Sequence, residues 1–225
     1  MGFRDHGIYD DVSSPTARTE SVLIVAGIAA AEARKARTLD IGGAFLNVDI
    51  TKTGIKTFVR LDKIMTSFLV RLDASYAKFV NPDGSCVVQL DRALYGTIEA
   101  ARLWYETICG KLQDSGFIKN PYDECVYNKI AKSGKQITVA FHVDDLLVTC
   151  EDEEELDEFT AMLRRAFPEV TEHRGDVLDY LAITLDFTTV GEVQSTVKKL
   201  VDDIIAGNGM TTERKTPSSE ELLRS

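Results

Sequence analysis

The chain has 225 residues, of which 44% are hydrophobic and 28% are charged, a composition typical of a soluble globular protein. The longest apolar stretch, residues 22–31, is about half of the roughly 20 residues that a membrane-spanning helix needs, and no signal-peptide layout surrounds it, so we expect no membrane partner. The net charge of −10 argues against a dense basic nucleic-acid surface, although residues 151–158 alone carry seven of the acids.

Apolar residues at helical spacing predict four helices. The first begins at the pair Ser14-Pro15, a capping residue followed by the residue favoured at the first helical position, and ends near residues 34–37. The other three are predicted over residues 93–115, 156–166 and 197–205. Gly116 is the predicted C-terminal stop of the second helix, and Trp104 within that helix is predicted to be a packed core aromatic.

Short apolar segments between turn signals predict the strands. They are expected over residues 38–41, 58–61, 68–72, 86–90 and 178–187. Residues 81–84, with the sequence NPDG, are a strong turn signal and predict a hairpin within residues 79–90. Helices and strands are mixed without a regular alternation, which predicts an α+β fold with an antiparallel sheet covered by helices on one side.

The strongest strand signal is the segment ITVAFHVDDLLVTC at residues 137–150. Apolar residues alternate with smaller or polar ones before Asp144 and Asp145, and an apolar run follows them, so a hairpin is predicted. Two carboxylates side by side at a hairpin tip repel each other, and a bound cation would remove that repulsion. The segment therefore indicates half of a metal-dependent site.

Asp40 is a lone acid in the apolar segment LDIGGAF and is the candidate for a third carboxylate. Mg²⁺ prefers oxygen ligands, and two such ions about 4 Å apart support phosphoryl and nucleotidyl transfer without a covalent nucleophile. The alternative interpretation of Asp40 is an exposed strand carboxylate or a turn former. Asp144 and Asp145 could equally be an ordinary surface pair.

An ordered series of motifs along nearly the whole chain resembles a known family. The motifs are HGIYDDVSSPTARTESV at 6–22, LDIGGAFLNVDI at 39–50, LDRALYGTIEAARLWYETI at 90–108, GFIKNPYDECVYNK at 116–129, FHVDDLLVTC at 141–150 and DYLAITLDF at 179–187. They are similar to the motifs GIDYxETFSPVxxxxTIR, LDVxxAFLNGxL, LxKALYGLKQAPRxWYxxL, GFxxSxxDxCLYxK, YVDDxLIxG and YFLGIEI. These belong to the reverse transcriptases of copia-type (pseudoviral) LTR retrotransposons.

The resemblance implies a polymerase palm, an antiparallel sheet backed by helices, with partial fingers and at most the start of a thumb. The implied domains are a palm with partial fingers at 1–190 and a hairpin and helix at the start of the thumb at 191–225, ending in a truncated tail. The implied reaction is RNA-directed DNA synthesis from dNTPs on an RNA or DNA template with a primer, dependent on two Mg²⁺ ions or on Mn²⁺. Family members act in cytoplasmic particles, and the sequence does not indicate an oligomeric state.

The resemblance also implies roles for individual residues. Asp40 matches the first catalytic, metal-binding aspartate, and Asp144 and Asp145 match the pair in the YVDD box. Phe45 matches the aromatic residue that reads the sugar 2′ position.

Three other positions of the substrate site are compared with the family in the same way. His142 replaces the tyrosine of the box and could stack near the primer. Glu99 replaces a glutamine beside the incoming nucleotide, where its charge should weaken binding, and Arg102 is retained.

The basic fingers segment expected before Gly2 is missing, so we expect a fragment or degenerate copy with weak or no polymerase activity. Two alternatives stay open. One is a catalytically inactive nucleic-acid-binding remnant, which binds primer–template in a salt-dependent way. The other is a purely structural α+β domain whose aspartates bind nothing.

Overall fold

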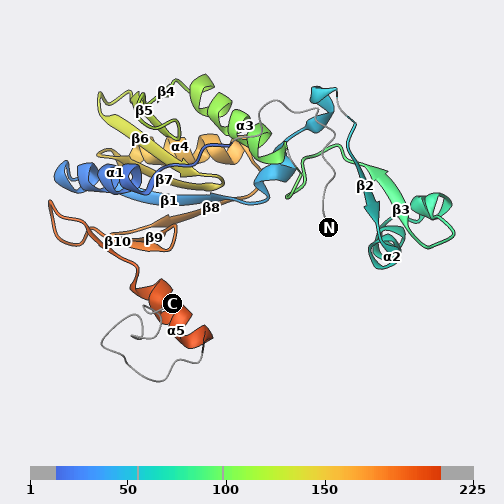
Figure 1. The fold of residues 1–225 in the computed structure, drawn as a ribbon. Helices are drawn as coiled ribbons and strands as arrows, with labels where there is room; N and C mark the ends of the chain where they lie inside the picture. The colour runs from blue at the N-terminus through green and yellow to red at the C-terminus, as the bar shows by residue number, and fades with distance from the viewer. Residues whose placement is uncertain (1–13, 55, 98, 209–225) are drawn as a thin grey trace, which may run out of the picture.

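The computed structural model describes residues 14–54, 56–97 and 99–208 (Figure 1). Its centre is an antiparallel sheet with the strand order β4-β5-β6-β7-β1-β8. The strands are β1 (Lys35–Ile41), β4 (Ile118–Lys119), β5 (Val126–Ile130), β6 (Gln136–His142), β7 (Asp145–Cys150) and β8 (Val170–Arg174). The mixture of helices with antiparallel sheets confirms the predicted α+β class.

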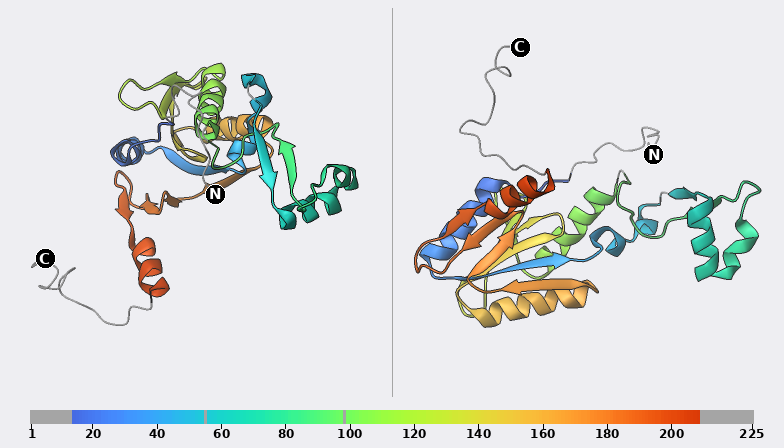
Figure 2. Two further views of the ribbon diagram at one scale, coloured as in Figure 1. Left: turned by 45° about the vertical axis from the view of Figure 1, so that its right-hand side comes forward. Right: turned by 90° about the horizontal axis from the view of Figure 1, so that it is seen from below.

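Both faces of this sheet are covered (Figures 1 and 2). Helices α3 (Ala100–Asp114) and α4 (Glu153–Ala166) cover one face, and Trp104 packs there against Phe167 with ring centroids 5.3 Å apart. Helix α1 (Thr19–Ala31) and a small sheet cover the other face. The small sheet consists of β9 (Val177–Tyr180), β10 (Ile183–Asp186) and β11 (Gln194–Thr196). The prediction that helices cover only one face of the sheet is therefore wrong. Because both faces are covered, residues 146–150 of β7 are all buried.

The predicted start of the first helix at Ser14-Pro15 is also wrong, because α1 begins at Thr19. The preceding residues are held by the rest of the fold: the Ala17 amide donates to the Phe141 carbonyl at 3.2 Å, and the Arg18 amide donates to the Asp123 carboxylate at 3.0 Å. These contacts with residues far along the chain take the place of a local cap. The helix ends at Ala31, and the basic residues 34–37 belong to the turn and to β1.

An arm projects from the main body between β1 and α3 (Figure 1). It contains β2 (Phe58–Leu61), α2 (Lys63–Leu72), the 3-10 helix η3 (Ala74–Phe79) and β3 (Cys86–Gln89). The strand predicted over 68–72 is wrong, because Asp62 caps α2 by accepting from the Met65 amide at 2.8 Å. The turn at 81–84 is confirmed, but no hairpin forms within 79–90, because β3 pairs with β2 across α2.

Two further elements differ from the expectation in where they begin or end. The helix predicted from residue 93 starts at Ala100, after Gly96, whose φ is +87°. The strand predicted over 178–187 is two strands, β9 and β10, because Leu181 and Ala182 form a tight turn with φ of +51° and +64°. Positive φ at both central residues matches the twist of a two-residue hairpin, but it normally requires glycine or asparagine, so the sequence carried no turn signal.

The remaining helices agree with the predictions. Helix α4 begins within the acidic run, with Asp152 accepting from the Glu154 amide at 3.0 Å, and α5 (Lys198–Gly207) corresponds to the helix predicted over 197–205. Gly116 ends α3 with a φ of +85°, as predicted. In the described ranges, no helix is long and apolar enough to cross a bilayer. Residues 1–13 and 209–225, which include the truncated tail expected at the C-terminal end, lie outside the described residues.

A buried ion-pair network joins β1, β8 and α4. Arg37 is 1% exposed, and its Nη1 lies 2.9 Å from Glu172 Oε1 and 2.7 Å from Asp157 Oδ1. Glu172 Oε1 also accepts from the Thr160 hydroxyl at 3.1 Å. Since a buried charge is tolerated only when it is paired, this network is needed to bring the three elements together.

The same network predicts how stability depends on pH. Burial acts to raise the pKa of Glu172, but hydrogen bonds from Arg174 and Thr160 and the nearby guanidinium charges outweigh it, and the pKa is lowered. A lowered pKa in the folded state stabilises the protein above the unfolded value, about 4.3, and this contribution is lost as pH falls further. We expect Glu172→Gln to flatten the fall in unfolding free energy between about pH 5 and pH 3, measured by urea unfolding. A fall parallel to that of the wild type would contradict this.

Candidate active site

The predicted hairpin forms, and it brings all three predicted acids together at one end of the sheet. His142 at the end of β6 pairs with Asp145 at the start of β7, so Val143 and Asp144 form a two-residue turn. On its other side β7 pairs with β1, which places Asp40 directly opposite Asp145. Opposite residues of antiparallel strands have Cβ atoms about 5 Å apart on the same face of the sheet.

Asp144, the second residue of the turn, is hydrogen-bonded to the end of β1. The Ile41 amide donates to the Asp144 carbonyl at 3.1 Å, so the turn is fixed to the end of β1. Ile41 itself is fully buried. The backbone of the turn is therefore anchored next to Asp40, near the end of β1.

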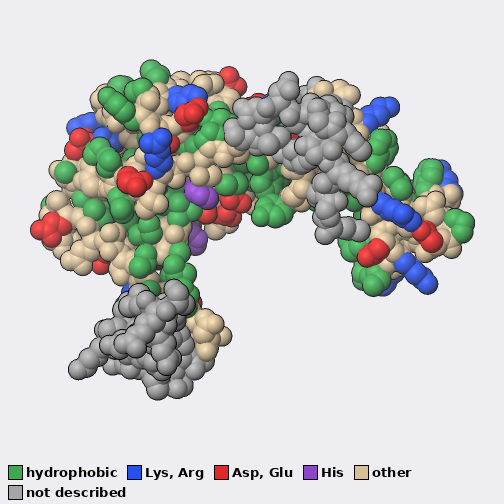
Figure 3. All heavy atoms as spheres, in the orientation of Figure 1, with side chains coloured by type: hydrophobic (Ala, Val, Ile, Leu, Met, Phe, Trp, Pro, Cys, Tyr) green, Lys and Arg blue, Asp and Glu red, His purple; other side chains and the backbone are tan. Residues whose placement is uncertain are grey.

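The charges of these acids act on one another. Burial, followed by the charge of Asp144, raises the pKa of Asp40, while His173 acts in the opposite direction. Burial, followed by the charges of Asp144 and Asp40, raises the pKa of Asp145, while His142 lowers it. Figure 3 shows histidine and acidic side chains together on the surface that faces the arm. The site is thus a concentration of negative charge that a cation would stabilise.

A pocket of about 610 Å³ opens beside the hairpin turn. His142, Val143, Asp144 and Asp145 line one side. Its other lining residues include Phe45, from the 3-10 helix η1 (Ala44–Asn47), and Tyr95, whose ring centroid is 5.6 Å from that of Phe45. The pocket therefore combines carboxylates with an aromatic surface, the two features needed to hold a metal-bound nucleotide.

Two of the predicted substrate residues do not line this pocket. Glu99 is buried at the start of α3, where burial raises its pKa and Arg102 opposes that shift. Arg102 instead pairs with Glu106 on the same helix at 2.7 Å. The pocket therefore gathers Asp144, Asp145, Phe45 and His142, but not Glu99 and Arg102. Asp40 is not among its lining residues and lies opposite Asp145 on the neighbouring strand.

The side chains of the acids do not converge as metal ligands in this conformation. Within the described part of the chain, no group of three or more His, Cys, Asp and Glu side chains is placed to hold a metal ion. Their chemistry fits Mg²⁺ or Mn²⁺, because the donors are carboxylate oxygens whose mutual repulsion a divalent cation would relieve. The backbone positions of the three acids are adjacent. Rotation of their side chains would therefore be enough to bring the carboxylates together around a cation.

Two aromatic residues hold the hairpin turn from opposite faces of the sheet, and the sequence analysis did not assign them this role. Trp104 Nε1 donates to the Val143 carbonyl at 2.8 Å, in addition to the core packing that was predicted for it. The Tyr180 hydroxyl lies 3.2 Å from the Asp145 carbonyl and 3.3 Å from the Ala140 carbonyl. Since both contacts join residues at least 35 positions apart, no local pattern in the sequence indicates them.

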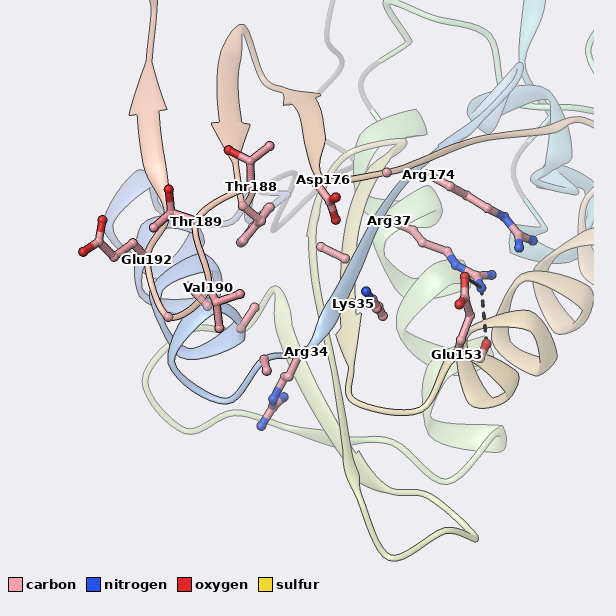
Figure 4. A pocket seen from close by; sticks show the side chains of 17 residues that line it. Arg34, Lys35, Arg37, Glu153, Arg174, Asp176, Thr188, Thr189, Val190 and Glu192 are labelled. Carbon is pink, nitrogen blue, oxygen red and sulfur yellow. Dashed lines mark hydrogen bonds and ion pairs between the residues drawn. The ribbon is translucent and has the colours of Figure 1, made fainter.

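A second pocket, of about 330 Å³, lies at the opposite end of β1 and is lined partly by basic residues (Figure 4). The charges of the three arginines among them are paired within the protein. Arg34 pairs with Glu32 at 2.6 Å, and Arg37 and Arg174 both pair with Asp157, at 2.7 and 2.8 Å. The hairpin pocket is therefore the candidate active site.

An antiparallel sheet backed by helices, with paired aspartates on a central hairpin and a third on the neighbouring strand, is the palm of a nucleic-acid polymerase. Residues 2–218 match the family described as reverse transcriptase (RNA-dependent DNA polymerase). The chain belongs to this family. The resemblance to copia-type retrotransposon enzymes is confirmed.

Among known proteins, the chain is similar to retrovirus-related Pol polyproteins of plant transposons. It is 29% identical over 146 residues to that of transposon RE1 from Arabidopsis thaliana and 24% identical over 144 residues to that of transposon TNT 1-94 from Nicotiana tabacum. Each match covers 64% of this chain and 9% or 10% of the relative, so the chain spans about a tenth of these polyproteins.

Two solved structures are also similar to the chain. Apo telomerase from Candida tropicalis has a TM-score of 0.46 at 8% identity, covering 81% of this chain and 41% of the telomerase. Telomerase from Candida albicans has a TM-score of 0.41 at 9% identity, covering 94% of this chain and 37% of the telomerase.

Proposed function

We propose that the chain carries the catalytic centre of an RNA-directed DNA polymerase, which adds dNTPs to a primer on an RNA or DNA template. The observation that carries this proposal is the pairing of β1 with β7, which sets Asp40 opposite Asp145 and beside the turn that carries Asp144. Membership of the reverse transcriptase family supports it.

Asp40, Asp144 and Asp145 would hold two Mg²⁺ ions, or Mn²⁺ in their place. When bound, such ions supply electrostatic stabilisation of the attacking and leaving oxygens of nucleotidyl transfer. The protein's own contribution is to position the reactants: the Phe45 ring lines the same pocket as Asp144 and Asp145 and would contact the sugar of the nucleotide. His142 lies on the primer side in this proposal and could stack there.

The arm of β2, α2 and β3 represents partial fingers in this proposal, and residues 1–190 form the palm with those fingers. Residues 191–225 are the start of the thumb. We also place the protein in the cytoplasm, where particles of such elements act. Strand β11 pairs with β10, so the proposed thumb segment begins within the small sheet.

We propose that polymerase activity of this chain alone is weak. No lysine or arginine is present among the described residues that line the hairpin pocket, so none of these residues would neutralise a triphosphate there. Glu99 is buried and does not line that pocket, so the predicted effect of its charge on nucleotide binding stays a prediction. Low affinity for dNTPs would follow from the pocket itself.

Primer extension tests the proposal. The purified chain, at a concentration above that of an RNA template annealed to a DNA primer, should incorporate dNTPs slowly with Mg²⁺ or Mn²⁺ and not at all with excess chelator. Salt-dependent binding of primer–template without incorporation under any metal would replace the proposal with an inactive nucleic-acid-binding remnant. Absence of both primer–template binding and dNTP incorporation would favour the other alternative, a purely structural α+β domain whose aspartates bind nothing.

Phe45 provides a prediction about sugar selection. Replacing Phe45 with Ala removes the ring that would exclude a 2′ hydroxyl, so we expect the use of ribonucleotides relative to deoxynucleotides to rise roughly 10- to 100-fold. Competition between the two nucleotides in primer extension measures the ratio. Leu46→Ala, a neighbour that lines the same pocket, is the matched control and should leave the ratio unchanged.

A further inference from the structure

The hairpin turn has an unusual backbone conformation at Val143. This residue separates His142 from Asp144, and its φ is +58°. A β-branched side chain disfavours that left-handed region, which glycine or asparagine normally occupies. The turn therefore needs contacts from the surrounding fold to keep its shape, and such strained residues concentrate at functional sites.

The first such contact comes from α3. Trp104 is 1% exposed, and its indole N–H donates to the Val143 carbonyl at 2.8 Å. The indole ring is itself packed against Phe167. Because the ring cannot move freely, its N–H fixes the carbonyl that lies immediately before Asp144.

The second contact comes from the opposite face of the sheet. Tyr180 is 3% exposed, and its hydroxyl lies within hydrogen-bonding distance of the carbonyls of Asp145 and Ala140. These two residues belong to β7 and β6, so one hydroxyl connects both strands of the hairpin. Its partner on β7 is the second acid of the pair.

We propose that Trp104 and Tyr180 are positioning residues, which hold the strained turn so that the carboxylates of Asp144 and Asp145 can bind a shared divalent cation. This inference rests on the proposed function. Each aromatic residue fixes a carbonyl next to an acid, so a change of the turn at Val143 would redirect the carboxylates away from Asp40. Neither aromatic residue is among the lining residues of the hairpin pocket.

Tyr127 provides a matched control, because it is a buried tyrosine that packs in the core without holding the hairpin turn. It is a fully buried tyrosine of β5, and its hydroxyl interacts with the Cys109 thiol of α3 rather than with the hairpin turn. Removing that hydroxyl should therefore alter neither the turn nor the acids. Tyr127→Phe makes the same chemical change as Tyr180→Phe in the same sheet.

Hydrogen exchange of the metal-free protein tests whether the turn is held. Backbone amides in residues 140–147 should exchange about 10-fold faster in Trp104→Phe and Tyr180→Phe than in the wild type, while Tyr127→Phe exchanges like the wild type. Melting temperature identifies any variant that fails to fold, and Tyr180→Phe, which only removes an oxygen, is decisive if Trp104→Phe unfolds. Unchanged exchange in the folded variants would overturn the inference.

Mn²⁺ binding, followed by electron paramagnetic resonance, tests the effect on the acids. We expect the dissociation constant to rise about 10-fold in Trp104→Phe and Tyr180→Phe, as for other residues that orient metal ligands, and not in Tyr127→Phe. One outcome would overturn only the role of the aromatic residues: the wild type binds Mn²⁺, Asp144→Asn does not, and both aromatic variants bind as tightly as the wild type. Absence of binding by the wild type would overturn the proposed metal site, and with it this role of the aromatic residues.

Discussion

Replacing Asp144 with Asn is expected to reduce primer extension by at least about 10³-fold, because stabilisation of a reacting oxygen by a bound metal contributes several kcal/mol to the barrier. The amide keeps the size of the side chain and removes its charge. A neutral oxygen is a poor ligand for a hard divalent cation, so Mn²⁺ affinity should fall as well.

The control for this variant is Asp202→Asn. Asp202 lies on α5 and pairs with Lys198, so its replacement removes one negative charge without touching the hairpin. Extension by Asp202→Asn should equal that of the wild type. If Asp144→Asn retains extension within a factor of ten of the wild type, the assignment of the catalytic aspartates is wrong.

Replacing Arg37 with Met is expected to lower the free energy of unfolding by about 3 kcal/mol or more, because it leaves acids of a buried network without their central cation. The side chain is 1% exposed and contacts Glu172 and Asp157 at ion-pair distance. Urea unfolding measures the change, with the slope checked for two-state behaviour.

Arg164→Ala is the matched control for this network. Arg164 pairs with the same acid, Glu172, at 3.2 Å, but its side chain is 52% exposed. An exposed ion pair contributes at most about 1 kcal/mol, so this variant should be nearly as stable as the wild type. Equal effects of the two replacements would show that burial of Arg37 does not determine the strength of the network.

Much of the candidate site could be predicted from the chain, because its signals are local. The alternation of apolar residues around Asp144 and Asp145 predicted the hairpin, and the segment containing Asp40 predicted a strand; both are confirmed. The roles of Glu99 and Arg102 rested on resemblance alone. Their position beside the nucleotide stays a prediction that the buried location of Glu99 does not favour.

The wrong predictions have a common cause, which is competition from contacts between distant residues. The cap signal at Ser14-Pro15 was strong locally, but hydrogen bonds to Phe141 and Asp123 hold the following residues in extended form. Residues 68–72 form a short apolar run, and such a run does not distinguish a strand from a helix. The fold decides these cases through pairing and burial.

The sequence by itself determined the α+β class, the hairpin with Asp144 and Asp145 at its tip, and the stop at Gly116, because periodicity and turn chemistry act over a few residues. Only the tertiary structure decided that β1 lies beside β7, that Glu99 is buried, and that Trp104 and Tyr180 hold the turn from two faces. Strand register and long-range hydrogen bonds depend on which distant segments meet, and that information is not contained in any local stretch of the chain.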